Sequence, residues 1–525
     1  MPRILVLDGI SEQAVNVFKQ AGYEVDVKPA QKPPELAAII GDYEAMVVRS
    51  GTKVTAEALE QATQLKVIGR AGVGTDNIDK AVATEKGVVV MNTPGGNTIS
   101  TCEHAFALLL SLCRNIPRAH ASMEAGRWDR KLFMGSELRG KTLGVVGVGR
   151  IGGEVVKRAK AFEMKVLAFD PLLTQLKAEA LGVKLVSFDD LLGQADFISI
   201  HAPKSDKTTN MIRAEHMRRM KPTCRIINCA RGGIVNEADL AEALKEGIIG
   251  GAALDVYTSE PFENNPFIGL DNVIMTPHLA ASTGEAQLSV AVDVARQVVD
   301  FLETGAIVNA VNVPSLDSET RKQLQPLLEL AEQLGKFLSL YTEGVPDTID
   351  IEYVGDLGIS DTYPLTAAVI AGYLSPMVES VNMVSAPSML KARGINSSEK
   401  RSARDTDYAF EIGVSVTTSE GGHSVHGTLF SEDPIITSID RMRIDTKLEG
   451  VMVLCENEDV PLMIGRITTL IGEAGVNIAN LVLGRDKRGG RALTVLNVDQ
   501  QVDAETLDAI RNIRHVLGVR ALDLT

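Results

Sequence analysis

The sequence predicts an α/β protein built on two parallel sheets, followed by a mixed α+β region and a small terminal domain. Strand-like apolar runs alternate with helical patterns as far as residue 313, which is typical of βαβ units. A Gly-x-Gly-x-x-Gly turn lies near the middle of the chain, between Gly147 and Gly152. The region 451–525 shows a βαββαβ order, which predicts a ferredoxin-like unit.

Length and composition limit the class of protein. At about 150 residues per domain, 525 residues predict three or four domains, each able to bury its own core. The formal net charge of −15 argues against a nucleic-acid binder, which would gain affinity from clustered Lys and Arg. Five cysteines without a Cys-x-x-Cys pair predict neither a disulfide framework nor a metal site. The chain begins directly with a strand-like run and has no apolar run of ~20 residues, so we expect a cytoplasmic protein with no membrane partner.

The two parallel sheets are predicted from short buried strands that alternate with amphipathic helices. Between the two sheets a long helix is expected to begin near Ser100, with Ser100 as its N-cap and Glu103 completing a capping box. This helix is expected to bridge two domains. The first sheet is expected to contain strands at 4–7, 45–48, 67–69 and 88–91, and the second strands at 143–146, 166–169, 197–200, 225–228, 251–256 and 273–275.

The glycine turn lies between a strand-like run at 141–146 and a helical pattern. Gly147, Gly149 and Gly152 therefore stand at a strand-to-helix turn, where the backbone can approach a pyrophosphate at a helix N-terminus. Asp170 ends the next apolar run, about 20 residues beyond the turn. A carboxylate there would hydrogen-bond a ribose 2′-hydroxyl and repel a 2′-phosphate. The combination predicts a dinucleotide site that binds NAD.

Three polar side chains, Arg231, Glu260 and His278, each follow a different strand-like run of the second sheet. In a doubly wound sheet, residues beyond the carboxyl ends of the strands line the ligand crevice. His278 could accept the hydroxyl proton of a 2-hydroxy acid while hydride leaves the same carbon, and Glu260 could hold the other ring nitrogen. Arg231 could pair with the substrate carboxylate. His201 also follows a strand, but it has no Glu partner in the sequence and is interpreted as structural or cofactor-contacting.

Four segments carry a family resemblance: the glycine turn, Ile-Asn-Cys-Ala-Arg-Gly-Gly at 227–233, Ala-Leu-Asp-Val-Tyr at 253–257 and Thr-Pro-His-Leu-Ala-Ala-Ser-Thr at 276–283. Over residues 1–312 the chain resembles the D-isomer-specific 2-hydroxyacid dehydrogenases. The resemblance implies a Rossmann NAD-binding domain, residues 98–287, inserted in a flavodoxin-like substrate-binding domain, residues 1–97 plus 288–313. Besides the three glycines, Asp170, Arg231 and His278, it implies that the cofactor is contacted by Val73, Arg150, Ile151, Pro203, Thr208, Cys229, Ala230, Asp255, Ala280 and Ala281.

Segments 69–79, 92–97 and 128–138 narrow the resemblance to those members of the family that act on a phosphorylated acid. They imply oxidation of 3-phospho-D-glycerate to 3-phosphohydroxypyruvate with NAD, the first step of phosphorylated L-serine biosynthesis. A phosphorylated substrate needs cations beyond Arg231. The resemblance places Arg130 and Lys131 in the cleft of a neighbouring subunit. The other substrate contacts that it implies are Arg49, Ser50, Gly72, Asn97, Arg231 and His278.

The tail resembles that of the long members of this family, with an intervening domain at 314–450 and an ACT regulatory domain at 451–525. A helix is expected over 314–343. The resemblance implies a homodimer or homotetramer and a possible amino-acid effector, for which Asp459 and Asn477 are candidate ligands. Leu462 stands where the family usually has glycine, so its side chain is expected to hinder that effector site.

Four basic residues of the intervening region, Lys391, Arg393, Arg401 and Arg404, allow two interpretations. They could form an anion site, or they could belong to an exposed basic loop, and the second interpretation is favoured.

Two other functions are compatible with the same core. A dehydrogenase or reductase acting on glyoxylate, hydroxypyruvate or 2-oxoglutarate would keep Arg231, Glu260 and His278 but would not need Arg130 and Lys131. An NAD-sensing corepressor would also keep the three residues and would act by binding partners. The ACT-like terminus favours the phosphoglycerate enzyme.

Overall fold

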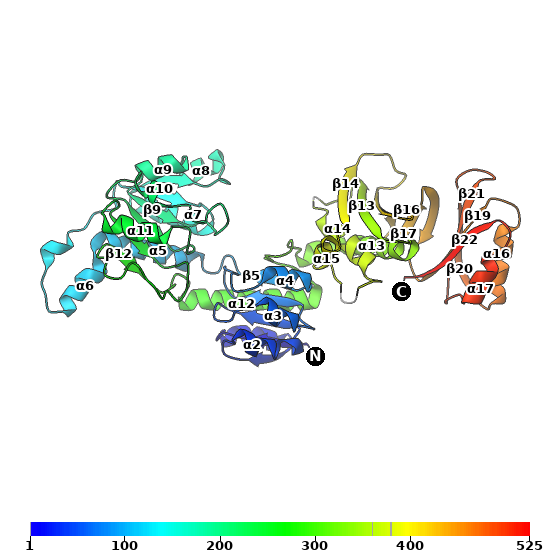
Figure 1. Cartoon of the computed structure of the whole chain (residues 1–525), viewed down its shortest axis with the longest axis horizontal. Coiled ribbons are helices and arrows are strands. Elements are labelled where there is room, and N and C mark those ends of the chain that lie inside the picture. The colour runs from blue at the N-terminus through cyan, green and yellow to red at the C-terminus, as the bar shows by residue number, and fades with distance from the viewer. Residues whose placement is uncertain (1, 360, 379–380, 525) are drawn as a thin grey trace.

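The computed structural model describes residues 2–359, 361–378 and 381–524. Four sheets follow one another along the long axis of the molecule (Figure 1). The sheet formed by the N-terminal residues lies between the second sheet, at the left of the view, and the two C-terminal sheets, at the right. Within the described ranges, no helix is long and apolar enough to cross a membrane.

The first sheet is parallel, and its strands other than the edge strand at 24–27 are buried on both faces, which explains why they are mostly apolar. Helices α1 (Glu12–Gln20) and α12 (Gly284–Thr304) cover one face. The other face is covered by α2 (Pro33–Ala37), the 3₁₀ turn η1 (Ile40–Asp42), α3 (Ala56–Glu60) and α4 (Lys80–Glu85). The strand order is β2 (Glu24–Val27), β1 (Arg3–Val6), β3 (Ala45–Val48), β4 (Val67–Arg70), β5 (Val89–Asn92).

This strand order confirms the flavodoxin-like sheet. Helix α12 returns to the sheet from beyond residue 283, so the second sheet is an insertion between β5 and α12. Helix α12 packs closely against the sheet, because a Cβ added at Gly69 on β4 would lie 2.7 Å from the Val294 side chain of α12.

The second sheet has the doubly wound order expected of a Rossmann domain and is parallel throughout. Helices α5 (Thr98–Arg114), α7 (Arg150–Ala161) and α8 (Gln175–Leu181) cover one face. Helices α9 (Phe188–Gln194), α10 (Ala214–Met217) and α11 (Glu237–Lys245) cover the other. The strand order is β12 (Val273–Met275), β11 (Gly251–Leu254), β10 (Arg225–Asn228), β9 (Phe197–Ile200), β6 (Thr142–Val146), β7 (Lys165–Phe169), β8 (Lys184–Leu185).

The predicted N-cap of the long helix, Ser100, was wrong by three residues. Helix α5 begins at Thr98 with Asn97 as N-cap, and Ser100 lies inside the first turn, where its hydroxyl donates to the Asn97 carbonyl. Just before the helix, Gly96 passes Val290 of α12 at close range, since a Cβ there would lie 2.4 Å from the Val290 side chain. After α5 the chain forms α6 (Ile116–Glu124) and the 3₁₀ turn η2 (Arg130–Phe133), which project away from the rest of the molecule (Figure 1).

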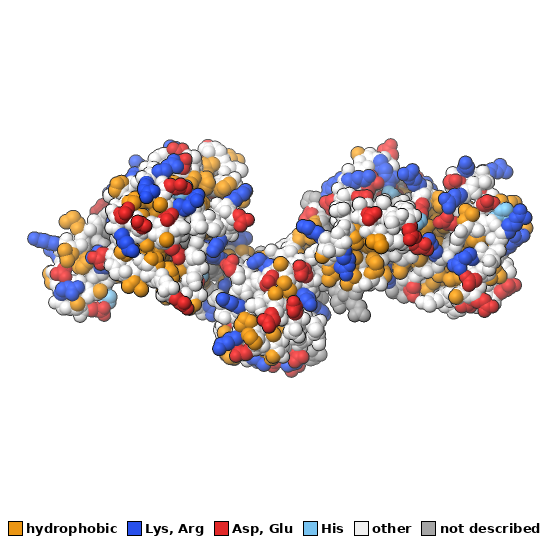
Figure 2. All heavy atoms as spheres, in the orientation of Figure 1, with side chains coloured by type: hydrophobic (Ala, Val, Ile, Leu, Met, Phe, Trp, Pro, Cys, Tyr) orange, Lys and Arg blue, Asp and Glu red, His pale blue; other side chains and the backbone are white. Residues whose placement is uncertain are grey.

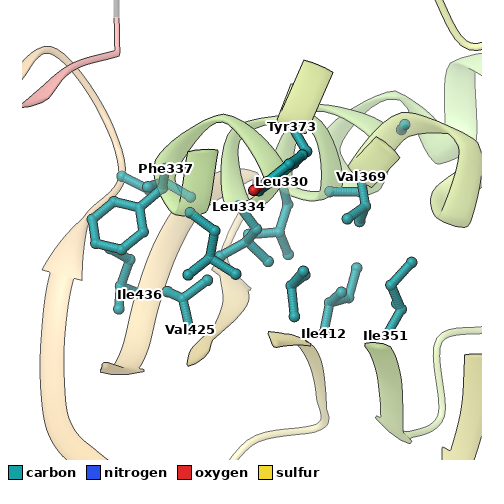
Figure 3. Close-up of a cluster of buried hydrophobic side chains, with 14 of the residues drawn as sticks. Leu330, Leu334, Phe337, Ile351, Val369, Tyr373, Ile412, Val425 and Ile436 are labelled. Carbon is teal, nitrogen blue, oxygen red and sulfur yellow. The ribbon is translucent and has the colours of Figure 1, made fainter. Parts of the chain in front are cut away.

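The third sheet belongs to the intervening region and packs against two long helices. Helix α13 (Ser318–Tyr341) crosses α14 (Tyr363–Leu374), and α15 (Ala386–Ala392) packs beside α14. Figure 3 shows Leu330, Leu334 and Phe337 of α13 directed toward apolar side chains of the sheet. The strand order is β14 (Asn396–Ser402), β13 (Pro346–Gly355), β15 (Phe410–Thr418), β16 (Gly421–Phe430), β17 (Asp433–Ile439), β18 (Met442–Lys447), antiparallel except between β13 and β14.

The fourth sheet is antiparallel and confirms the ferredoxin-like ACT unit. Its alternation separates two environments: Val451 and Val453 face helices α16 (Met463–Glu473) and α17 (Ala504–Arg511), whereas Met452 and Leu454 join the core of the intervening region. The two C-terminal sheets therefore share one apolar core. The strand order is β20 (Ile478–Arg485), β21 (Arg491–Val498), β19 (Val451–Glu458), β22 (Val516–Asp523).

The α13–α14 crossing depends on glycine, which yields a stability prediction. A Cβ on Gly372 would overlap the Glu332 carbonyl of α13, so Gly372→Ala should destabilise the intervening region by about 1–3 kcal/mol. Gly465→Ala is the matched control, since Gly465 lies inside α16 with open space around its Cβ position and the change should stabilise by about 0.4–1 kcal/mol. Differential scanning calorimetry of the full chain checks both. An unchanged transition midpoint in Gly372→Ala would contradict the close crossing.

Candidate active site

A cavity of about 620 Å³ lies between the carboxyl ends of the first two sheets. Loops after β3, β4 and β5 form one wall, and loops after β10, β11 and β12 form the other. The predicted residues that line it are Arg49, Ser50, Gly72, Val73, Asn97, Arg231, Glu260, His278 and Ala281. The strand-end argument from the sequence thus brings the three candidate catalytic side chains into one cavity.

His278 and Glu260 form a hydrogen-bonded pair. His278 Nδ1 lies 2.7 Å from Glu260 Oε2, and the Tyr257 backbone N–H donates to Glu260 Oε1 at 3.0 Å. The hydrogen bond to Glu260 raises the pKa of His278 against the opposing effect of burial. Burial by itself would raise the pKa of Glu260, but the hydrogen bonds from His278 and Tyr257 outweigh it and lower that pKa. The pair can therefore hold a proton on the imidazole, with Nε2 left for a ligand.

The buried carboxylate of Asp255 fixes the loop that carries His278. It accepts hydrogen bonds from the Leu279 and Ala280 backbone N–H groups at 2.7 and 2.9 Å and from the Thr276 hydroxyl at 2.6 Å. These contacts bracket His278, whose φ of +56° is unusual for a residue with a side chain. Asp255 is fully buried and its carboxylate is engaged by this loop. Its predicted contact with the cofactor stays a prediction.

Arg231 reaches across the cavity to the first sheet's wall. Its Nε lies 3.3 Å from Asp76 Oδ2, and its Nη1 donates to the Ala230 carbonyl at 2.7 Å. Asp76 is largely exposed, so the ion pair is open to competition by a carboxylate of a ligand. The loop that carries Arg231 packs closely against Tyr257, because a Cβ on Gly232 would overlap the Tyr257 carbonyl group.

Sequence reasoning missed two cations of this cavity, Arg70 and Lys204. Burial, together with the nearby charges of Arg231 and Arg49, lowers the pKa of Arg70 to about 10. Its Nη1 donates to the Ala71 carbonyl at 3.1 Å, while its Nε is buried with no hydrogen-bond partner among the described residues. Arg70 ends β4, so the strand-end argument used for Arg231 could have found it. Four cationic side chains, Arg49, Arg70, Lys204 and Arg231, therefore line one cavity.

The remaining residues on the first sheet's side are held by backbone contacts. The Gly72 N–H donates to Thr93 Oγ1 at 2.8 Å, and its φ of +141°, with Arg70 against its Cα, suits glycine. Asn97 Oδ1 is buried and has no partner within the described part of the chain. Its free acceptor is compatible with the predicted role in binding substrate.

The glycine turn has the geometry of a dinucleotide cradle. Gly147 adopts φ of +88°, and a Cβ there would lie 2.9 Å from the His201 carbonyl group. A Cβ on Gly152 would overlap the Gly147 carbonyl oxygen, whereas Gly149 faces open space. The open space lies at the N-terminus of α7, at Arg150 and Ile151, where a pyrophosphate would meet backbone N–H groups. The cradle fits the predicted NAD.

The other predicted cofactor contacts surround this cradle. Asp170 follows β7, and its carboxylate accepts the Val148 and Leu172 N–H groups, both at 2.8 Å. Thr208 closes the loop after β9 by donating to the Pro203 carbonyl at 2.7 Å. Cys229 and Ala230 follow β10. Burial raises the pKa of the Cys229 thiol, so it is an unreactive part of the wall.

His201 differs from His278 in every respect that matters for proton transfer. Burial lowers its pKa to about 4, and its Nε2 lies 2.8 Å from Ser199 Oγ. It has no carboxylate partner among the described residues, and its interpretation as structural or cofactor-contacting stays a prediction.

Arg130 and Lys131 do not line the cavity of their own chain. They lie in η2, in the projecting segment that follows α6, and both are exposed. Three large apolar side chains of this segment are also exposed: Trp128 at 80%, Leu132 at 70% and Met134 at 87%. Figure 2 shows acidic and basic side chains interspersed over the face in view. The predicted role of the two cations therefore depends on a second subunit.

The candidate effector ligands of the ACT unit are engaged within the chain. Asp459 accepts the Gly489 N–H at 3.0 Å and pairs with Arg485 at 3.1 Å, contacts that lower its pKa, and Asn477 donates to Asp499 at 2.6 Å. Leu462 adopts φ of +75° and is 72% exposed at the start of α16.

The four basic residues of the intervening region do not converge on a described cavity. Arg404 lies 3.0 Å from Glu411 and 3.8 Å from Glu352, so its charge is balanced within the chain. Arg401 donates to the Ile359 carbonyl, and Lys391 and Arg393 lie at the end of α15. All four side chains are exposed, as the favoured interpretation expects, but they do not form one loop, since Lys391 lies in α15 and Arg401 lies on β14.

Comparison with known proteins identifies the family. The chain is 42% identical to D-3-phosphoglycerate dehydrogenase of Archaeoglobus fulgidus over 99% of this chain and 100% of that protein. It is 41% identical to the enzyme of the same name from Methanocaldococcus jannaschii over the full length of both, and 38% identical to that of Bacillus subtilis, again over both full lengths. The chain belongs to the D-3-phosphoglycerate dehydrogenase family.

The architecture of the D-3-phosphoglycerate dehydrogenase family is matched part by part. Residues 106–280 match the D-isomer specific 2-hydroxyacid dehydrogenase, NAD binding domain, residues 323–440 match the D-3-phosphoglycerate dehydrogenase intervening domain, and residues 451–515 match the ACT domain. These matches confirm the expected family, the NAD-binding domain and the long form of the chain.

Solved structures resemble the first two domains. The TT0316 protein of Thermus thermophilus is 32% identical with a TM-score of 0.54, and covers 57% of this chain and 97% of its own. The apo-structure of D-lactate dehydrogenase from Escherichia coli is 26% identical with a TM-score of 0.53, and covers 59% of this chain and 99% of its own.

The His278–Glu260 contact yields a direct titration prediction. Because Glu260 stabilises the protonated imidazole, Glu260→Gln should lower the pKa of His278, as followed by NMR of labelled histidine. Glu263→Gln, an exposed carboxyl in the same loop, should leave that pKa unchanged. A His278 pKa that is equal in wild type and Glu260→Gln would contradict the contact.

Proposed function

We propose that this chain oxidises 3-phospho-D-glycerate to 3-phosphohydroxypyruvate with NAD, as the first step of phosphorylated L-serine biosynthesis. The observation that carries the proposal is the cavity in which the His278–Glu260 pair faces four cationic side chains. A 2-hydroxy acid with a phosphate carries three negative charges at most, and charge-assisted hydrogen bonds from Arg suit both its carboxylate and its phosphate. The full-length relatives named D-3-phosphoglycerate dehydrogenase support the same assignment.

In this proposal His278 is the acid/base catalyst. Its Nδ1 is held by Glu260, so Nε2 accepts the proton from the substrate 2-hydroxyl as hydride leaves C2. The imidazolium that forms is stabilised by the carboxylate 2.7 Å away. In the reverse direction the same Nε2 returns the proton to the 2-oxo group.

Arg231 orients the substrate carboxylate. Its planar guanidinium now pairs with exposed Asp76, and a bidentate substrate carboxylate would take over that position. Arg49 and Arg70, on the opposite wall, are left for the phosphate. Burial of Arg70 excludes water from one side of its guanidinium, which strengthens its attraction to a dianion.

Bound at the cradle, NAD would supply the acceptor for the hydride that leaves C2. Asp170 would hold its ribose hydroxyls and disfavour NADP, because the carboxylate would repel a 2′-phosphate. Gly147, Gly149 and Gly152 would leave room for the pyrophosphate.

We also propose a homodimer in which the projecting segment completes the partner's cavity. Exposed large apolar side chains gathered on one short segment are typical of an interface. Docked on a second copy, the segment would carry Arg130 and Lys131 toward the partner's substrate. The ACT unit is the place for a possible amino-acid effector, and the exposed Leu462 side chain would weaken its binding there.

The substrate proposal predicts the specificity of turnover. NADH formation at 340 nm should be strongest with 3-phosphoglycerate and weak with D-glycerate, D-lactate and D-2-hydroxyglutarate. Arg130→Ala plus Lys131→Ala should lower kcat/KM for 3-phosphoglycerate at least tenfold, since one charged hydrogen bond contributes roughly 1.5–3 kcal/mol. The control Arg218→Ala plus Lys245→Ala removes two exposed cations elsewhere on the same domain. Preference for an unphosphorylated acid would indicate a sibling dehydrogenase, and no turnover would indicate a binding protein.

The dimer proposal predicts a change of mass in solution. Trp128→Glu plus Leu132→Glu should shift the sedimentation coefficient toward that of a smaller assembly, because two charges would be buried in the interface. Val345→Glu changes an equally exposed apolar side chain in the intervening region and should leave the assembly intact. Sedimentation of the double variant identical to wild type would exclude the segment from the interface.

A further inference from the structure

A second cavity, of about 330 Å³, lies where the first domain meets the intervening region. Gly87, Val89 and Phe301 line it from the first domain, and Tyr363, Ala367 and Met383 line it from the intervening region. It is separate from the candidate active site, with which it shares no lining residue. Its volume lies within the range typical of small-molecule sites.

The walls of this cavity are mostly apolar, but they contain one cation that has no ion-pair partner among the described residues. Arg321, on the first turns of α13, is half-buried. Its guanidinium lies against the backbone of Gly305, since a Cβ there would be 2.7 Å from Arg321 Nε. In the described part of the chain no carboxylate lies within ion-pair distance of it. A guanidinium held in apolar surroundings favours an anion as its counterpart.

The second cation of the cavity cannot serve the same purpose. Lys66 Nζ is 2.7 Å from Glu44 Oε2, so its charge is already balanced. The cavity therefore offers one free positive charge beside an apolar surface that includes the rings of Phe301 and Tyr363. This combination is complementary to a ligand with one negative charge and an apolar, ring-sized body.

We infer that this cavity binds a small organic monocarboxylate with an apolar, ring-sized body, its carboxylate paired with Arg321. The inference is independent of the dehydrogenase reaction. The ligand would contact both sides of the connection at Val313 and Pro314, which also line the cavity. The Asn382 side chain already links the intervening region to the first domain, because it donates a hydrogen bond to the Gly87 carbonyl at 3.1 Å. A bound ligand would add contacts to both sides and fix the two parts relative to each other.

The test uses 3-phenylpropionate, which lacks the 2-hydroxyl and 2-oxo groups of a substrate, titrated into the full chain by calorimetry. Arg321→Gln should raise its Kd at least about tenfold, and Arg296→Gln, an exposed arginine of α12 outside the cavity, should not. The neutral analogue 3-phenylpropanamide should bind wild type more weakly than the acid. Excess NADH and 3-phosphoglycerate should leave binding unchanged, which separates this cavity from the active site.

A second variant keeps the test independent of the charge. Met383→Trp fills the cavity without altering Arg321 and should abolish binding of the acid, with NADH formation from 3-phosphoglycerate retained as the measure of correct folding. The titration extends to about 10 mM, roughly tenfold above a Kd of 1 mM. If wild type binds no 3-phenylpropionate over this range, the inference is overturned. Equal affinity of wild type, Arg321→Gln and Met383→Trp would also overturn it.

Discussion

The buried carboxylate of Asp255 is the constraint on which the active-site geometry depends. In place of water, this carboxylate accepts hydrogen bonds from the Thr276 hydroxyl and from the backbone N–H groups of Leu279 and Ala280. His104 Nε2 lies 3.2 Å from it. Burial by itself would raise the pKa of Asp255, but these hydrogen bonds outweigh it and hold the pKa below its usual value. The result is a rigid loop that can keep His278 in a left-handed backbone conformation opposite Glu260.

The active site also depends on the insertion of one parallel domain into another. Because α12 returns to the first sheet after the NAD-binding domain is complete, the carboxyl ends of both sheets face one cavity. The wall from the second sheet carries His278 and Glu260 with two of the four cations, Lys204 and Arg231, and the wall from the first sheet carries Arg49 and Arg70. The Arg231–Asp76 ion pair joins the two walls. A substrate carboxylate that replaced Asp76 would therefore meet a guanidinium that is already held in position.

The C-terminal half is joined by a single core instead of a flexible linker. One face of the ACT sheet packs against the intervening region, and polar contacts surround that interface: Tyr341 donates to Glu456 at 3.3 Å, and Arg520 donates to the Tyr341 carbonyl. Asn497 also donates to the Lys447 and Glu449 carbonyls. The ACT sheet and α13 therefore pack in the same apolar core.

The sequence by itself determined the architecture and the family. Apolar runs buried on both faces specify parallel strands, the glycine spacing specifies the dinucleotide turn, and residues that end strands, such as Arg231 and His278, can be assigned to the crevice. Local pattern also misled in one place, since Ser100 has the type of an N-cap but Asn97 occupies that position.

Only the tertiary structure decided which charges remain free, because pairing joins residues distant in sequence. Arg231 meets Asp76, and Lys66 meets Glu44, whereas Arg70 and Arg321 are left facing cavities. No spacing rule reports such contacts, since they depend on how the domains pack.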